Sequence, residues 1–220
     1  MRDDGTWLEP APVTPLTGDE PLPGTGSTVR NFWSFALSDL KTNIARGVLA
    51  EFFVARAVGA EESVRVSWDN FDVRTPDGIR IEVKSAAYLQ GWRQAKLSTI
   101  RFSGLTGLAW DDSDGWGAER EVRADVFVFG IQTRKTHEDY DALDVAQWDW
   151  YVASASSVVE HGARRWAWTF SSAMPRARWA TRRSTGQSGP RLFSATRGLD
   201  RRPPGEPRPA YEGGERGLRT

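Results

Sequence analysis

The segment FDVRTPDGIRIEVKS, residues 71–85, constrains the fold most, because two apolar alternating stretches flank a Pro-Asp-Gly turn. Proline presets the φ angle of a turn, and glycine accepts the left-handed conformation. A two-residue loop would mix polar and apolar side chains on each face of the hairpin. A three-residue loop instead pairs Val73 with Ile81 and Phe71 with Val83. Since a one-residue slip turns side chains to the wrong face, the apolar pattern predicts the three-residue loop.

This register brings charged side chains together on one face. Glu82 and Lys84 are two residues apart on a strand and share a face, and the register places Asp72 opposite Glu82. Two carboxylates roughly 5 Å apart at Cβ suit a hard divalent cation such as Mg²⁺. The alternative is a cross-strand salt bridge on a solvated sheet face, where charge pairs are common.

A further carboxylate, Glu51, lies on a helical stretch over roughly residues 33–58, which has a break near Lys41–Asn43 and a natural end at Gly59. At 100° per residue Glu51 falls in the middle of an apolar stripe formed by Ile44, Val48, Ala55 and Val58. A lone carboxylate there is costly unless it is paired, protonated or bound to a metal. The alternative is partial exposure at the edge of the sheet.

The remaining pattern predicts a mixed α/β domain. We expect strands at 64–68, 71–75, 79–86, 124–133 and 148–154, and a Gly- and Asp-rich loop at 104–119. The uninterrupted apolar run at 124–133 is typical of an interior strand.

Composition divides the chain into three parts. Residues 1–28 are rich in Pro, Gly, Thr and acid without periodicity, which predicts a disordered N-terminal segment before a globular domain over 29–162. Residues 1–162 carry 16 basic against 25 acidic residues, whereas 163–220 carry 13 arginines against 4 acids. This last segment is either a basic, low-order tail that contacts phosphates or the product of a GC-rich gene read out of frame. Its lack of Ile, Val and Lys favours the second interpretation, and we expect no fold there.

The overall composition also excludes several kinds of site. The chain has no cysteine, which excludes disulfides, thiolate zinc sites and a cysteine nucleophile, and it has only two histidines. No apolar run approaches the roughly 18 residues of a membrane span, and the N-terminus lacks the basic and apolar stretches of a signal peptide. We therefore expect a cytoplasmic protein without a membrane partner.

A glutamate on a first helix, an aspartate on one strand and Glu-x-Lys on the next resembles the PD-(D/E)xK nuclease superfamily, with its restriction-endonuclease-like fold. The resemblance covers about residues 33–133. It implies a mixed β-sheet flanked by helices and Mg²⁺-dependent hydrolysis of DNA phosphodiester bonds, with Mn²⁺ as a substitute, in restriction, defence or repair. By position, Asp72 and Glu82 would be the metal-binding acids, Lys84 the catalytic lysine and Glu51 an additional metal-binding carboxylate. The pattern departs from the family where Phe71, not proline, precedes Asp72, and no convincing second helix follows Lys84.

Three functions are consistent with these residues. The first is a DNA endonuclease, in which six basic residues against two acids over 73–102 would contact the phosphate backbone. The second is an inactive nucleic-acid- or protein-binding member of the same fold. The third is an unrelated α/β domain with a salt-bridge network. Asp69 is an alternative metal ligand, and a homodimer is an allowed assembly.

Overall fold

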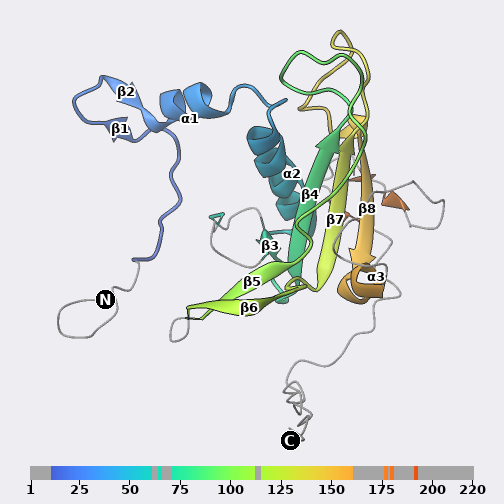
Figure 1. Ribbon diagram of the computed structural model, residues 1–220. Coiled ribbons are helices and arrows are strands. Elements are labelled where there is room, and N and C mark those ends of the chain that lie inside the picture. Colours follow the sequence, from blue (N-terminus) through green and yellow to red (C-terminus); the bar gives the residue numbers. More distant parts are fainter. Residues whose placement is uncertain are drawn as a thin grey trace, which may run out of the picture.

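The centre of the protein is a mixed β-sheet with the strand order β3-β4-β7-β8-β9 (Figure 1). The computed structural model describes residues 11–60, 64–65, 71–111 and 115–160, together with 176–177, 179–180 and 191–192. The main strands are β3 (Val73–Arg74), β4 (Arg80–Ala87), β7 (Val126–Gln132) and β8 (Trp148–Ser154). β4 and β7 are parallel, and the other neighbouring pairs are antiparallel. The prediction of a mixed α/β domain is confirmed.

The β3–β4 hairpin has the predicted three-residue loop. Val73 pairs with Ile81, and Gly78 has a φ of 90°. The Gly78 N–H donates to the Thr75 carbonyl, which closes the turn before the strands meet. The predicted Phe71–Val83 pair is wrong, because the ladder ends at Val73 and the Val83 N–H is bound by a side chain, as described below.

The parallel register of β4 and β7 is fixed where both strands begin. Arg80 Nε and Nη2 donate to the two carboxylate oxygens of Asp125 at 3.0 and 2.6 Å. The Arg80 backbone N–H donates to the same carboxylate, and the Asp125 N–H donates to the Arg80 carbonyl. β7 is buried along its whole length, as predicted for an interior strand. At Gly130 the chain passes so close to β8 that a Cβ would meet a ring carbon of Trp150 at 2.7 Å.

Helix α2 (Asn43–Val58) covers one face of the sheet beside β4 (Figure 1). It ends as predicted at Gly59, which has a φ of 74°, and the break before it is also confirmed, since α1 (Val29–Leu37) ends at Leu37. The predicted apolar stripe is partly wrong: Ala55 and Val58 pack against the core, but Ile44 is 79% exposed, and the buried positions are Ala45, Arg46, Ala50, Val54 and Ala57. The buried face of the helix is therefore rotated relative to the prediction and includes the charged residue Arg46.

The two faces of the sheet have separate cores. Ala50 and Val54 of α2 pack with Val83, Val128 and Trp150 on the first face. On the second face, Phe127 and Phe129 pack with Phe102 and with Val158 of the short helix α3 (Ala155–Glu160). The connection from β4 to β7 therefore supplies the cover of the second face over residues 100–105.

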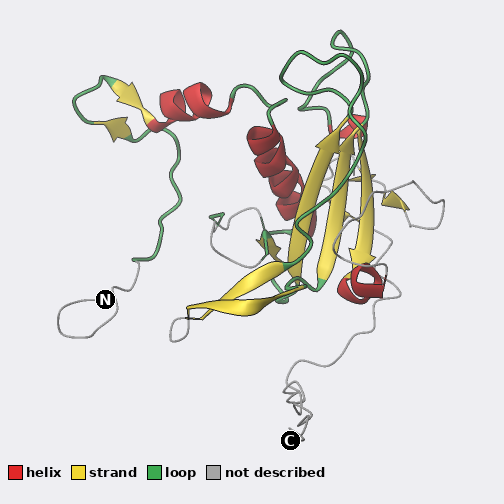
Figure 2. Cartoon of the chain, in the orientation of Figure 1, coloured by secondary structure: helices red, strands yellow, loops and turns green. Residues whose placement is uncertain are grey.

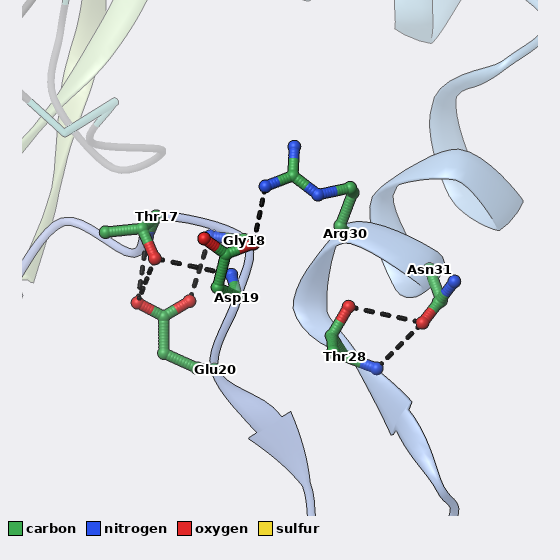
Figure 3. A network of polar contacts seen from close by, with 7 residues as sticks. All are labelled: Thr17, Gly18, Asp19, Glu20, Thr28, Arg30 and Asn31. Carbon is green, nitrogen blue, oxygen red and sulfur yellow. Dashed lines mark hydrogen bonds and ion pairs between the residues drawn. The ribbon is translucent and has the colours of Figure 1, made fainter.

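The N-terminal segment contains regular structure, so the prediction of disorder over residues 1–28 is wrong for 21–28. Strands β1 (Pro21–Leu22) and β2 (Ser27–Thr28) form a hairpin that leads directly into α1 and stands away from the sheet (Figure 1). Side-chain hydrogen bonds organise it: Thr17 and Gly18 donate to Glu20, Arg30 donates to Asp19, and Asn31 accepts from Thr28 (Figure 3). Bonds from the Thr17 backbone lower the pKa of Glu20 to about 2. Residues 1–10 lie outside the described part.

The Gly- and Asp-rich segment predicted as a loop is also structured. It forms a hairpin of β5 (Gly107–Asp111) and β6 (Gly115–Glu121), which extends from the sheet (Figure 2). Gly107 and Asp111 are the end residues of β5, Gly115 begins β6 and Gly117 lies within it, so residues that are typical of loops are here part of strands.

In the C-terminal segment the structure describes three two-residue strands. β9 (Arg176–Ala177) pairs with β8, and β10 (Trp179–Ala180) pairs with β11 (Arg191–Leu192). The rest of 163–220 lies outside the described residues. Before β8, a 3₁₀ turn η1 (Val145–Gln147) is present. None of the helices in the described ranges has the length and apolar character that crossing a membrane requires.

Candidate functional site

The four predicted site residues come from three elements that meet at the short β3 strand. Glu82 and Lys84 lie on β4, Asp72 immediately precedes β3, and Glu51 lies on α2. β3 has only two residues, so the edge of β4 beyond Ile81 is open to side chains from α2 and from the segment before β3. The negative charge of Asp72 raises the pKa of both glutamates, and that of Glu51 raises the pKa of Glu82, so the three carboxylates lie within range of one another's charge.

Asp72 is fixed by hydrogen bonds to β4. Its backbone N–H donates to the Ile81 carbonyl at 2.9 Å, and its Oδ2 accepts from the Val83 N–H at 2.7 Å. The carboxylate thus takes the place of a strand partner where the β3 ladder ends. A carboxylate that accepts from a backbone N–H is strongly held, which leaves Oδ1 as the oxygen that this bond does not use.

Glu82 and Lys84 form an ion pair along one face of β4. The Lys84 Nζ lies 2.5 Å from Glu82 Oε1, and the side chains are 26% and 17% exposed, respectively. In the parallel register Glu82 is the partner of Phe127 and Lys84 is the partner of Phe129, so both stand on the face of the aromatic core. Burial raises the pKa of Glu82; Lys84 opposes this effect, and the negative charges of Asp72 and Glu51 add to it.

Glu51 approaches the same place from α2. Its side chain is only 12% exposed and forms a bidentate ion pair with Arg65. Burial raises the pKa of Glu51, the Arg65 hydrogen bond lowers it, and Asp72 raises it further. Because the helix is rotated, Glu51 lies at the margin of the buried face and not in its centre, which matches the alternative of an edge position.

The carboxylates therefore repel one another and are balanced by two cations. Within the described residues, no three side chains of His, Cys, Asp or Glu are arranged so that they could hold a metal ion. Lys84 and Arg65 currently occupy carboxylate oxygens of Glu82 and Glu51. The role of Glu51 as a third metal ligand stays a prediction, and Asp69, the alternative ligand, lies outside the described residues.

The loop at residues 100–105 passes close to the end of the Lys84 side chain. A Cβ on Gly104, which has a φ of 69°, would lie 3.9 Å from Lys84 Nζ. Phe102 on the same loop contacts Phe129, with ring centroids 4.8 Å apart. The Lys84 ammonium therefore lies close to the backbone at Gly104, and no pattern in the sequence indicated this proximity.

Two glutamines that follow the Glu-x-Lys motif have structural roles that the sequence did not reveal. The Gln90 N–H donates to Gln94 Oε1 at 2.8 Å, and Gln94 Nε2 donates to Ser98 Oγ at 3.0 Å. Gln90 Oε1 accepts from Arg46 at 3.2 Å. These bonds organise the segment after β4, and the Gln-xxx-Gln spacing was the signal that could have indicated it.

Some of the basic side chains in residues 73–102 are engaged in contacts within the protein. Arg80 is paired with Asp125, and the Arg74 guanidinium lies over the Phe71 ring at 4.5 Å. Arg93, Lys96 and Arg101 are exposed, so these three remain accessible to a ligand.

Comparison with known proteins adds no assignment to this geometry. No protein-family model and no curated protein sequence matches the chain.

Chemically, the site offers hard oxygen donors beside a half-buried ammonium. Asp72 and Glu82 are two carboxylates on adjacent segments, and Mg²⁺ commonly binds one or two carboxylates together with waters and substrate phosphates. The donor set therefore fits this ion even without a third protein ligand. The low polarity of the Phe127 and Phe129 face strengthens charge interactions at the site.

Proposed function

We propose that this protein is a metal-dependent DNA endonuclease of the PD-(D/E)xK superfamily, with the restriction-endonuclease-like form of the mixed α/β fold. The observation that carries the proposal is the convergence of Glu51, Asp72, Glu82 and Lys84 beside β3, where burial and mutual repulsion raise the pKa values of two carboxylates. Clusters of buried, like-charged acids are unfavourable for stability and are common at catalytic sites.

In this proposal Asp72 and Glu82 hold Mg²⁺, with Mn²⁺ as a substitute. The ion would polarise the scissile phosphate and lower the pKa of a bound water. The Val83 N–H fixes the direction in which the Asp72 carboxylate points, and Lys84 holds Glu82. Glu51 would join them after its ion pair with Arg65 opens.

Lys84 acts on the substrate side of the site. Its ammonium has three N–H donors, and the contact with Glu82 uses one of them. The others can orient the attacking water or neutralise charge on the phosphate. Hydrolysis forms a bond from the water oxygen to phosphorus and breaks the P–O ester bond, which leaves a phosphate monoester and a hydroxyl.

Cleavage of supercoiled and linear DNA in Mg²⁺ or Mn²⁺ tests the proposal. We expect cleavage by the wild type, loss in Glu82→Gln and Lys84→Ala, and retention in the control Glu121→Gln. The control Glu121 has a 59% exposed side chain outside the site. Equal cleavage in all variants would identify a contaminating nuclease and contradict the proposal.

The alternative is an inactive nucleic-acid- or protein-binding member of the same fold. The observation that favours it is the neutralisation of Glu82 and Glu51 by Lys84 and Arg65, which leaves the cluster balanced without a metal. Metal binding without cleavage of any nucleic acid would support this alternative.

A further inference from the structure

A pocket of about 360 Å³ lies between the start of α2 and the segment that follows β4. Its lining includes Arg46 and Asn43 from α2, and Ser98, Thr99 and Arg101 from the segment after β4. Figure 1 shows that α2 begins at the end of the sheet where β4 ends. The pocket is therefore built by the same helix and strand that carry Glu51 and Lys84.

The wall of the pocket contains a buried arginine whose hydrogen-bond acceptors are all neutral. Arg46 is only 3% exposed. Its Nη1 donates to the Lys41 carbonyl at 2.9 Å and to Gln90 Oε1 at 3.2 Å, and its Nη2 donates to Asn43 Oδ1 at 2.6 Å. Arg46 Nε has no hydrogen-bond partner among the described residues. A guanidinium this buried is normally paired with a carboxylate or a phosphate.

The charge of the pocket is positive. Its lining has two arginines and no carboxylate in the part of the chain that the structure describes. Burial lowers the pKa of Arg46, and Tyr140 opposes this effect. The 16-residue helix α2 also begins here, so its positive N-terminal end adds to the field. An anion would relieve an otherwise uncompensated buried charge.

The position of the pocket relates it to the substrate of the proposed site. Arg46 precedes Glu51 by five residues on α2, which corresponds to about 7.5 Å along the helix axis. Ser85, which also lines the pocket, follows Lys84 on β4, so the pocket and the proposed catalytic site share this strand. Trp92 lines the pocket and is 55% exposed, so its ring is accessible to a base or sugar.

We propose that this pocket binds a phosphate group of the nucleic-acid strand, distinct from the phosphate at the acidic site. The proposal rests on the proposed nuclease function for the identity of the strand, whereas the preference for phosphate rests on the pocket itself. Arg46 forms the fixed base of the pocket, held by Gln90 and Asn43, and Arg101 closes on the anion from the exposed side. Arg46 and Arg101 are thus substrate-binding residues outside the catalytic cluster.

Calorimetric titration with inorganic phosphate in metal-free buffer tests the pocket, with chloride at equal ionic strength as the reference. The decisive variant is Arg101→Gln, because this arginine is exposed and its replacement leaves the core intact. The matched control is Arg93→Gln, an exposed arginine of the same segment outside the pocket lining. Arg46→Gln is a second variant, used after circular dichroism has shown that it folds.

We expect phosphate to bind the wild type and Arg93→Gln equally, and Arg101→Gln to bind it about tenfold more weakly, as the loss of a charge-assisted hydrogen bond predicts. An unlabelled oligonucleotide is expected to displace the bound phosphate. Absence of phosphate binding, or equal binding by the Arg101 and Arg93 variants, would overturn the proposal that this pocket binds phosphate. Phosphate binding that no oligonucleotide displaces would overturn its assignment to a nucleic-acid strand.

These outcomes separate the pocket from the proposed function because the titration contains no metal. If the wild type cleaves DNA but does not bind phosphate, only the proposal of a phosphate-binding pocket is overturned. If it binds phosphate and the oligonucleotide but cleaves no DNA with any metal, the phosphate-binding pocket is supported and the proposed nuclease function is overturned.

Discussion

Replacement of Glu82 by glutamine tests whether its carboxylate serves stability or function. Glu82 is buried beside the aromatic face of β4 and next to Asp72, and both effects raise its pKa against the opposing effect of Lys84. The folded state therefore binds a proton at Glu82 more tightly than the unfolded state does. That contribution is complete below the usual pKa of about 4.5 and is lost as the pH rises through the raised value.

Glu82→Gln removes this cost at neutral pH. Because the raised pKa means that the charged carboxylate costs stability, we expect the variant to be more stable than the wild type at pH 7. At pH 4, below the usual pKa of about 4.5, this difference should become smaller. Urea unfolding followed by circular dichroism, at both pH values, measures the two free energies of unfolding.

The control for this measurement is Glu121→Gln, whose exposed carboxylate lies 3.4 Å from Arg123 and contributes little. A loss of 1 kcal/mol or more in Glu82→Gln at pH 7 would refute the reasoning. It would show that Glu82 and Lys84 form a structural salt bridge, the third interpretation of the sequence.

Three further changes test individual parts of the account. Gly78→Val places a β-branched residue at a φ of 90° where nothing lies within 4 Å, so backbone strain alone should lower the free energy of unfolding in urea by about 1–3 kcal/mol. The control Gly107→Val should lower it less, and equal losses in the two variants would contradict the turn geometry. Gly130→Ala forces a Cβ to within 2.7 Å of a buried ring and should cost about 1–3 kcal/mol by the same assay, and an unchanged midpoint would contradict this packing. Arg65→Gln releases Glu51 from its ion pair, so calorimetry should show a few-fold higher Mg²⁺ affinity if Glu51 is a ligand, and unchanged affinity would remove Glu51 from the metal site.

The sequence predicted the elements whose patterns are local. The Pro-Asp-Gly turn and the alternation around it were sufficient for the Val73–Ile81 pair, and the apolar run was sufficient for β7. The helix end at Gly59 followed from its tolerance of a left-handed φ. Each of these depends on backbone preferences and on the period of a single segment.

Features that depend on tertiary contacts could not be predicted. The buried face of α2 was misassigned because a charged residue, Arg46, is accommodated by carbonyl and amide oxygens from other segments. The carboxylate of Asp72 replaces a strand partner of Val83, so a strictly continued ladder predicted one pair too many. The Arg65 ion pair with Glu51 joins residues with no common periodicity.

Calorimetric titration with Mg²⁺ tests the central claim, that Asp72 and Glu82 form a metal site, most directly. The account predicts one Mg²⁺ site in the wild type and in Glu121→Gln, and at least about tenfold weaker binding in Asp72→Asn and Glu82→Gln. No binding of Mg²⁺ or Mn²⁺ to the folded wild type, or equal affinity in all four proteins, would contradict it.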